Sequence, residues 1–305
     1  MYIIKKLKER YIQFIKHPLV EYPFWSLIKY IYINVRLRIQ KKPMEIKWFN
    51  GLKFYLSLGD SSIIENYYFH IYDYEESIFL IHFLKSKDLV VDIGANHGHY
   101  SLIASGICGA KSISIEPVRK TYDRLLMNVK VNMLNNVKTE NIGLSDDDGS
   151  LYFSNNLGNM NKVVDIGKMN LCERVEVTTL DKLLSPKENP EVIKIDVEGY
   201  EKKVLLGAKR ILKNHNLNII IIELNNSNSD YGYHEDDILS LLNGNGFHPY
   251  KYIYPENVLI PLRKKNFDSF NTIFIKDINF VEKRINQKSM SIEKSKRRFI
   301  KIDKL

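Results

Sequence analysis

Short apolar runs alternate with helical patterns along the chain from residue 89 onward. The runs are rich in Ile and Val, and helical segments with polar faces separate most of them. This alternation is typical of a mostly parallel sheet covered by helices. The expected strands are 89–93, 112–116, 137–142, 192–196, 218–223, 247–251 and 271–276, and the expected helices are 99–106, 119–134, 200–213 and 235–243.

The last two expected strands differ from the others because no helical segment lies between them. Their spacing predicts an antiparallel pair. We therefore predict an α/β fold whose seven-stranded sheet is mostly parallel, with an antiparallel last strand. Residues 150–154 and 174–180 are expected to form an additional β-hairpin around the Asn-rich loop 155–170.

The turn after the first of these strands has the features of a ligand site. Strand 89–93 contains Asp92 and leads into a turn with Gly94, Asn96 and Gly98. In a doubly wound sheet the ligand lies outside the carboxyl end of such a strand, and glycines let the backbone approach it closely. Glu116 ends the next strand, where a carboxylate can accept hydrogen bonds from both hydroxyls of a ribose.

The order of glycines and acids in this turn bears on the kind of cofactor. A dinucleotide site has the pattern G-x-G-x-x-G, which this turn lacks. Asp92 would repel a diphosphate, but its carboxylate can face an amino group directly or through water. S-adenosylmethionine carries an amino group, a ribose and an adenine. The adenine is expected beside the turn after the third strand, at Ile142 and Gly143.

Four motifs then resemble, in order, those of FkbM-type S-adenosylmethionine-dependent methyltransferases. They are Asp92-Ile93-Gly94-Ala95-Asn96-x-Gly98, Ile115-Glu116-Pro117, Thr179-Leu180-Asp181 and Lys194-Ile195-Asp196-Val197-Glu198-Gly199-x-Glu201. The resemblance extends over about residues 74–275. It implies a Rossmann-like class I methyltransferase fold and O-methylation, often of a sugar or polyketide. His97 departs from the family pattern, which more often has an aliphatic residue. We expect it to face solvent, and the alternative is a position over the cofactor.

The acids after the fourth and fifth strands are the expected acceptor site. Asp196 and Glu198 follow strand 192–196, and Glu223 ends strand 218–223. One carboxylate can bind substrate hydroxyls while another takes a proton, or the group can hold a divalent metal ion. A structural role is the alternative for Glu198, as a cap of the following helix. It is the better interpretation for Glu201, which begins that helix and meets its dipole favourably. Lys194 is expected to be half-buried.

The net charge of +9 is concentrated at the two ends. Residues 1–42 hold ten Lys and Arg against two Glu, and residues 281–305 hold nine basic residues against three acids. We therefore divide the chain into a basic, aromatic, helical extension (1–45), a methyltransferase domain (46–280) and a basic tail (281–305). Within the tail, residues 288–304 are expected to be a solvated or disordered segment without regular structure. The extension either lies in a membrane interface or packs on the domain; its apolar runs are too short to span a bilayer.

These features predict an S-adenosylmethionine-dependent O-methyltransferase acting on a sugar or glycan, in the cytoplasm or peripherally at the inner face of the membrane. The strand-four motif lacks the Asn/Asp-Pro-Pro-aromatic sequence of base N-methyltransferases, and nucleic acid is not the expected partner. An RNA 2′-O-methyltransferase using Lys194, Asp196 and Glu223, or a non-catalytic membrane-associated scaffold, are the alternatives. Cys108 and Cys172 provide neither a disulfide framework nor a metal cluster.

Overall fold

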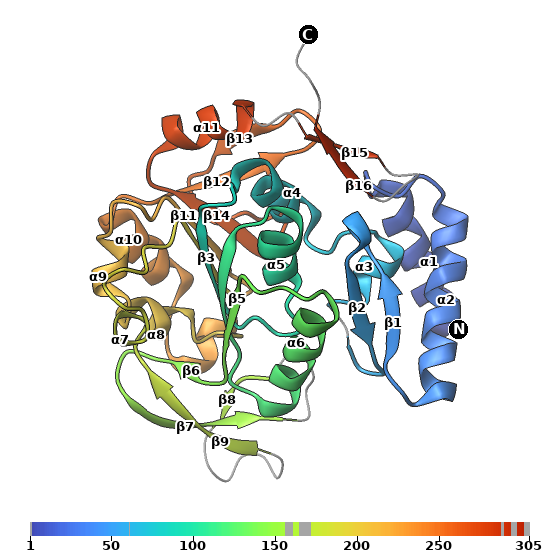
Figure 1. Ribbon diagram of the computed structural model, residues 1–305, viewed down its shortest axis with the longest axis horizontal. Helices are drawn as coiled ribbons and strands as arrows, with labels where there is room; N and C mark the ends of the chain where they lie inside the picture. Colours follow the sequence, from blue (N-terminus) through green and yellow to red (C-terminus); the bar gives the residue numbers. More distant parts are fainter. Residues whose placement is uncertain are drawn as a thin grey trace.

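An eight-stranded sheet lies at the centre of the computed structural model, which describes residues 2–60, 62–155, 161–164, 172–287, 290–293 and 298–301 (Figure 1). The strand order is β13-β12-β14-β11-β10-β3-β4-β5. The strands are β3 Leu89–Ile93, β4 Lys111–Ile115, β5 Val137–Glu140, β10 Val192–Ile195, β11 Ile219–Glu223, β12 His248–Ile253, β13 Val258–Pro261 and β14 Asn271–Ile275.

The strand directions confirm the predicted fold class. From β5 to β11 the strands run parallel, whereas the last strand, β14, inserts antiparallel between β11 and β12. The sheet has one strand more than the seven predicted, because β13 forms an antiparallel hairpin with β12. The sequence does not predict β13, because this short edge strand has no alternation of apolar and polar residues and ends in Pro261. Most of its side chains are exposed.

The isoleucines of β11 explain why the central strands are apolar at every position. Successive residues of a strand face opposite sides of the sheet. Ile219 and Ile221 therefore enter the hydrophobic core on one face, and Ile220 and Ile222 enter the core on the other. A parallel sheet with both faces covered needs apolar side chains on both, and all four isoleucines are fully buried.

Helices cover the two faces of the sheet (Figure 1). Phe79 and Phe83 of α4 belong to one core, whereas Val204 of α8 and Ile238 of α10 belong to the other. Expected helix 200–213 is divided into α8 and α9, and expected helix 99–106 is α5 followed by a π-helical segment, Leu102–Ile107. The helices are α1 Tyr2–Lys16, α2 Pro23–Gln40, α3 Glu65–Tyr68, α4 Tyr74–Phe83, α5 His99–Ser101, α6 Arg119–Val131, α7 Leu180–Leu183, α8 Glu201–Leu206, α9 Lys209–Leu212, α10 Glu235–Gly244 and α11 Ile278–Gln287.

A smaller sheet lies at one end of the central one. Its strand order is β6-β9-β7-β8, with β7 and β9 antiparallel, which confirms the predicted additional hairpin. Most of the expected loop 155–170 lies outside the described residues. The strands are β6 Gly143–Leu144, β7 Gly149–Ser154, β8 Val163–Val164 and β9 Cys172–Thr178.

The C-terminal region has more regular structure than its composition predicts. Strands β15 (Met290–Glu293) and β16 (Arg298–Lys301) form an antiparallel hairpin, so the expectation of a tail without regular structure is wrong for these residues. Before them, α11 is attached to the domain by Arg284, whose guanidinium donates two hydrogen bonds of 2.8 and 2.9 Å to Asp88. This bidentate geometry fixes the orientation of α11.

The N-terminal helices pack on the domain, beside the hairpin of β1 (Met44–Lys47) and β2 (Lys53–Leu56). Phe14 of α1 is fully buried, with its ring 4.9 Å from that of Phe69, and Ile33 of α2 is also fully buried. One face of the extension therefore contributes to the core of the protein.

Among the described residues, no helix has the length and apolar character needed to cross a membrane.

Replacing Phe14 with Ala tests this packing. We expect the free energy of unfolding to fall by about 3–5 kcal/mol, because the substitution leaves a cavity in a packed core. The neighbouring Ile15, 58% exposed, provides the matched control, and Ile15→Ala should change stability by no more than about 0.5 kcal/mol. Urea unfolding followed by circular dichroism measures both. Equal effects of the two substitutions would contradict the docking of α1.

Candidate functional site

The carboxyl ends of β3, β4, β10 and β11 meet at one edge of the central sheet. This edge is where ligands bind in open α/β sheets. The residues that the sequence singled out fall into two groups here, one around the turn after β3 and one after β10 and β11.

The turn after β3 requires glycine for steric reasons. Gly94 has φ of 74°, and a Cβ atom there would lie 1.8 Å from the backbone oxygen of Asp196. A larger residue cannot fit, because backbone atoms at the end of β10 occupy the space. Asn96 follows in the same left-handed region, with φ of 50°. The turn thus lies directly against the segment that carries the second group of acids.

Glu116 fixes the shape of this turn. One carboxylate oxygen accepts a hydrogen bond of 3.0 Å from the backbone N–H of Asn96, and the other accepts one of 3.0 Å from Val118. Burial of the side chain raises the pKa of Glu116 to about 7, although these backbone donors favour its charged form. Each oxygen has a second lone pair available for a ligand.

Asp92 is buried and partly used by the protein itself. Its Oδ2 accepts hydrogen bonds from the backbone N–H and the hydroxyl of Ser101, at 3.1 and 2.6 Å. Burial raises the pKa of Asp92 to about 6. One oxygen therefore holds Ser101, the last residue of α5, while the residue also lines the cavity beside the turn.

This first cavity measures about 100 Å³ and gathers most of the predicted site. Gly98, Ile142 and Gly143 do not line it, whereas Phe153 does. His97 lines the cavity but is only 6% exposed, with Nε2 3.4 Å from Oδ1 of Asp60, so the expectation that it faces solvent is wrong. The predicted residues that line the cavity are Asp92, Gly94, Asn96, Glu116, Asp196, Glu198 and Glu223.

Asp196, Glu198 and Glu223 form a compact group of carboxylates. Each offers an oxygen atom within 4.8 Å of the others, so among the described residues they are the group that could hold a metal ion. Burial, followed by the charge of Asp196, raises the pKa of Glu198 to about 7. The same two causes raise the pKa of Glu223, which shares a hydrogen bond with Asp196. The group thus readily retains a proton.

Lys194 lies beneath these acids and is only 1% exposed. The expectation of a half-buried lysine is wrong, because β10 is a central strand whose two faces are both covered. Its ammonium lies 3.4 Å from Oδ2 of Asp196 and donates a 2.9 Å hydrogen bond to Oδ1 of Asn271. Burial alone would lower the pKa of Lys194, but the nearby carboxylates, led by Asp196, raise it, so the side chain is cationic.

Two further residues, Asp73 and Tyr72, complete the site, and the sequence does not single them out. Asp73 accepts 3.0 Å hydrogen bonds from the Tyr100 hydroxyl and the Asn271 amide. Tyr72, beside it, receives its position from Asn66, whose side chain accepts the backbone N–H of Tyr72 at 2.7 Å. No motif in the sequence marks these residues. Asp73 owes its place to partners 27 and 198 residues away in the chain, and Tyr72 owes its place to the local loop that contains Asn66.

Glu201 has the structural role expected for it. It is 1% exposed, and its Oε1 accepts hydrogen bonds from the backbone N–H groups of Val197 and Gly199 at 3.3 and 3.0 Å. Glu201 thereby shapes the turn in which Glu198 adopts a left-handed φ of 53°. This leaves the Glu198 carboxylate in the acidic group rather than at the start of α8.

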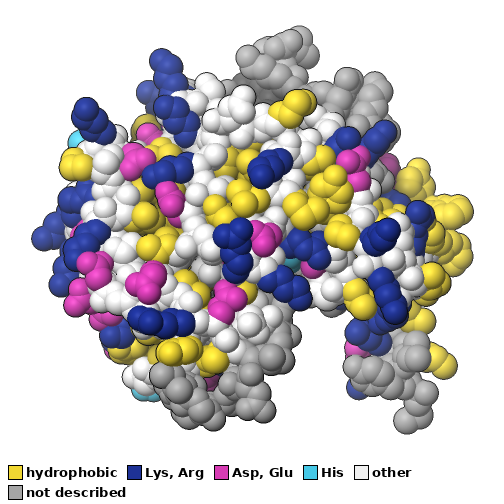
Figure 2. Space-filling model, turned by 60° about the horizontal axis from the view of Figure 1, so that its bottom comes forward, with side chains coloured by type: hydrophobic (Ala, Val, Ile, Leu, Met, Phe, Trp, Pro, Cys, Tyr) yellow, Lys and Arg dark blue, Asp and Glu magenta, His cyan; other side chains and the backbone are white. Residues whose placement is uncertain are grey.

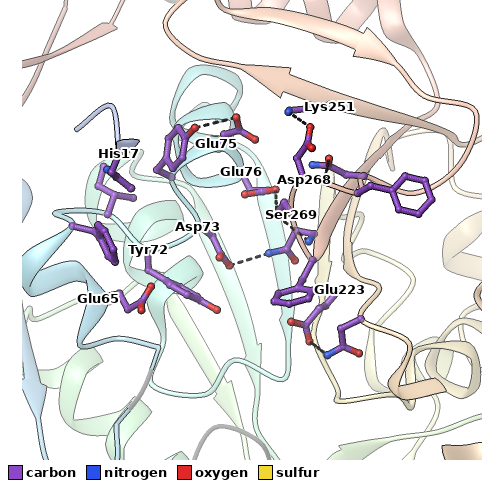
Figure 3. A pocket seen from close by; sticks show the side chains of 18 of the residues that line it. His17, Glu65, Tyr72, Asp73, Glu75, Glu76, Glu223, Lys251, Asp268 and Ser269 are labelled. Carbon is purple, nitrogen blue, oxygen red and sulfur yellow. Dashed lines mark hydrogen bonds and ion pairs between the residues drawn. The ribbon is translucent and has the colours of Figure 1, made fainter. Parts of the chain in front are cut away.

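A second, larger cavity of about 860 Å³ adjoins the first, since Tyr72 and Glu223 line both (Figure 3). It extends between α1, the start of α4 and the segment before β14. Several of its charges are already paired: Arg10 lies 3.0 Å from Glu65, and Lys251 lies 2.6 Å from Asp268. Phe267 and Phe270, both largely exposed, contribute aromatic surface.

Comparisons with known proteins agree with this geometry. A family model described as the methyltransferase FkbM domain matches residues 92–249. A curated relative, the hexuronic acid methyltransferase AglP of Haloferax volcanii, is 30% identical over 145 residues, which are 46% of this chain and 57% of the relative. The match therefore spans little more than half the length of that relative.

Solved structures that resemble the chain share little sequence with it. A putative methyltransferase from Streptococcus mutans in complex with SAH is 13% identical, with a TM-score of 0.41, over 66% of this chain and 96% of that one. TYW2 from P. horikoshii in complex with MeSAdo is 13% identical, with a TM-score of 0.42, over 78% and 73% of the two chains.

The family match covers both groups of acids, from Asp92 at the end of β3 through Glu116 and Asp196 to Glu223. It includes the turn at Gly94 that brings these groups together. The chain belongs to the FkbM methyltransferase family.

Proposed function

We propose that the protein is an S-adenosylmethionine-dependent O-methyltransferase that acts on a carbohydrate hydroxyl. The observation that carries this proposal is the position of Asp196, Glu198 and Glu223. These carboxylates line the cavity beside the Gly94 turn, and Glu223 also lines the larger cavity. A donor in the first cavity and an acceptor in the second would meet at these acids.

The first cavity has polar groups suited to S-adenosylmethionine. Glu116 has lone pairs left for the ribose hydroxyls, and Oδ1 of Asn96 is buried without a hydrogen-bond partner. Pro117 and Phe153 offer apolar contacts. A volume of about 100 Å³ is below the usual range for small-molecule sites, so cofactor binding requires some of the lining side chains to move.

The acids after β10 and β11 suit activation of a hydroxyl. The cofactor supplies a methyl group on a sulfonium, and the attacking oxygen must lose its proton. Asp196 is the group we assign to accept that proton, with Lys194 holding its carboxylate at 3.4 Å. Glu198 and Glu223 can accept hydrogen bonds from neighbouring hydroxyls of the acceptor or donate hydrogen bonds to them, since their raised pKa values allow a protonated form near neutral pH.

The lining of the larger cavity favours a carbohydrate. Carboxylates beside aromatic surface suit sugar hydroxyls and the apolar faces of sugar rings. RNA is the poorer fit, because six acids line the cavity and Arg10 and Lys251 are already paired with carboxylates. The relative AglP is named for a hexuronic acid, which supports a sugar acceptor here.

Two alternatives, a metal-dependent mechanism and a scaffold without catalytic activity, can be distinguished by experiment. If the three carboxylates bind a divalent ion, EDTA abolishes turnover and Mg²⁺ restores it. If the protein is a scaffold that has lost turnover, it fails to bind S-adenosylmethionine by calorimetry. Binding of the cofactor and transfer of a radiolabelled methyl group to isolated glycans would together support the proposed enzyme.

Glu116→Gln tests the cofactor site. We expect affinity for S-adenosylmethionine to fall by about tenfold to hundredfold, because the variant weakens hydrogen bonds to a charged group. Isothermal titration calorimetry measures the affinity. The control is Glu140→Gln, at the end of the neighbouring strand β5, which does not line the cavity. Unchanged affinity in Glu116→Gln would remove Glu116 from the donor site.

Asp196→Asn tests the proposed base. The amide cannot accept the acceptor's proton, so turnover should fall by roughly 10²–10⁴-fold while affinity for S-adenosylmethionine changes little. Asp123→Asn, on the outer helix α6, is the control. Loss of cofactor affinity with normal turnover at saturating cofactor would assign Asp196 to the donor site instead.

The buried acids also predict a pH dependence of stability. Burial raises the pKa of Glu201 from 4.5 to about 7, so the folded state holds a proton that the unfolded chain releases in that interval. The free energy of unfolding should therefore decrease as the pH rises from about 4.5 to about 7. In Glu201→Gln the difference in stability between pH 5 and pH 8 should be smaller by about 3 kcal/mol. The control Glu256→Gln, on the surface, should keep the wild-type dependence; identical curves for all three proteins would contradict the prediction.

A further inference from the structure

An apolar stripe runs along the solvent side of α2. Successive members are separated by four, three, four and four residues, which places them on one face of a helix. The opposite face, with Ile33 and Leu37, is buried against the domain. The stripe consists of Phe24, Ile28, Ile31, Val35 and Ile39, flanked by Trp25 and Tyr32, and all seven side chains are exposed.

Helix α1 lies beside α2 and extends this surface. Its exposed apolar residues Ile4, Ile12 and Ile15 share one face of the helix. Together with Tyr22 and the α2 stripe they form what we call the α1–α2 surface. Of the eighteen exposed large hydrophobic side chains among the described residues, eleven belong to it. Figure 2 shows hydrophobic side chains gathered along the edge where Figure 1 places these helices.

Basic side chains border the α1–α2 surface. Residues 1–42 contain ten Lys and Arg but only Glu9 and Glu21 as acids. Two of the ten, Arg10 and Lys16, line the larger cavity instead. On α2, Lys29 and Arg36 lie on one flank of the stripe and Arg38 on the other, so their long side chains can reach past the apolar residues. A second copy of the same surface would bring like charges together, which disfavours a symmetric dimer. Exposed Ile, Phe and Trp side chains likewise do not match the charged phosphate backbone of a nucleic acid.

We propose that the α1–α2 surface docks on a bilayer that contains anionic lipids. The apolar stripe would enter the acyl boundary, Trp25 and the exposed tyrosines would lie at the level of the headgroups, and the basic residues would contact anionic headgroups. The helices lie in the plane of the interface in this arrangement. This agrees with the finding that no described helix is suited to span the membrane.

The other face of α1 gives this surface a link to the acceptor site. Arg10, Gln13, Lys16 and, directly after α1, His17 line the larger cavity, and Figure 3 shows His17 there. Arg10 and Gln13 lie on the side of α1 opposite Ile4 and Ile15. A docked protein would therefore hold that cavity one helix away from the bilayer. This suits a saccharide attached to a lipid, a step of the inference that rests on the proposed function.

The test is co-sedimentation of the full-length protein with vesicles. We expect binding to vesicles of phosphatidylcholine mixed with phosphatidylglycerol and little binding to phosphatidylcholine alone. Trp25→Glu combined with Ile28→Glu should weaken binding to the anionic vesicles by at least tenfold. Lys5→Gln combined with Lys8→Gln should weaken it by roughly fivefold per lysine, since each basic residue near an anionic surface contributes about that factor.

The matched control is Val258→Glu combined with Ile260→Glu, two exposed apolar residues of the edge strand β13, which should bind like the wild type. Failure of the wild type to sediment with anionic vesicles, or equal loss in control and test variants, would overturn the proposal. So would a wild-type dimer that Trp25→Glu with Ile28→Glu dissociates, in the absence of vesicle binding. Calorimetry with S-adenosylmethionine on each variant separates this outcome from failure of the proposed enzymatic function, because none of these residues lines the donor cavity.

Discussion

The buried ammonium of Lys194 is the constraint on which the arrangement of the site depends. A charge at 1% exposure is tolerated only with close partners, and these come from different parts of the chain. Asp196 comes directly after β10, the strand of Lys194, and Asn271 belongs to the antiparallel strand β14. Through Asn271 the network reaches Asp73, at the start of α4. One cation thus holds together the sheet centre, its last strand and a helix that borders the larger cavity.

This concentration of charge costs stability and changes the proton affinity of the acids. Burial, and then repulsion within a group of carboxylates less than 4.8 Å apart, raises the pKa values of Glu198 and Glu223, so these two side chains hold protons more readily than exposed acids do. The left-handed backbone of Glu198 adds local strain, which Glu201 helps to maintain through its hydrogen bonds to the turn. The fully buried isoleucines of β11 offset these costs, since hydrophobic burial acts on both faces of the same strands.

The sequence predicts the parts of the site that lie at strand ends. Asp92, Glu116, Asp196 and Glu223 are recognisable because an acid that closes an apolar run has few other places to face than the sheet edge. Asp73 is not recognisable in this way. It reaches the site from a loop, and its partner Asn271 is 198 residues away, so local periodicity contains no sign of the pair. Ile142 is expected from the sequence to lie beside the adenine, but Phe153 of the small sheet lines the cavity and Ile142 does not. The sequence predicts the hairpin that carries Phe153, but not how this hairpin packs against the site.

Helix α1 connects the chemistry of the site with the outer surface. The side chain of Phe14 anchors α1 in the core and thereby fixes the orientation of the helix. One of the other sides of α1 faces the larger cavity, and another faces solvent. An amphipathic helix needs only one apolar face to fold onto a domain. A second apolar face on the solvent side adds nothing to that packing and lowers solubility in water. Its presence beside a basic sequence therefore points to a partner outside the chain that is both apolar and anionic.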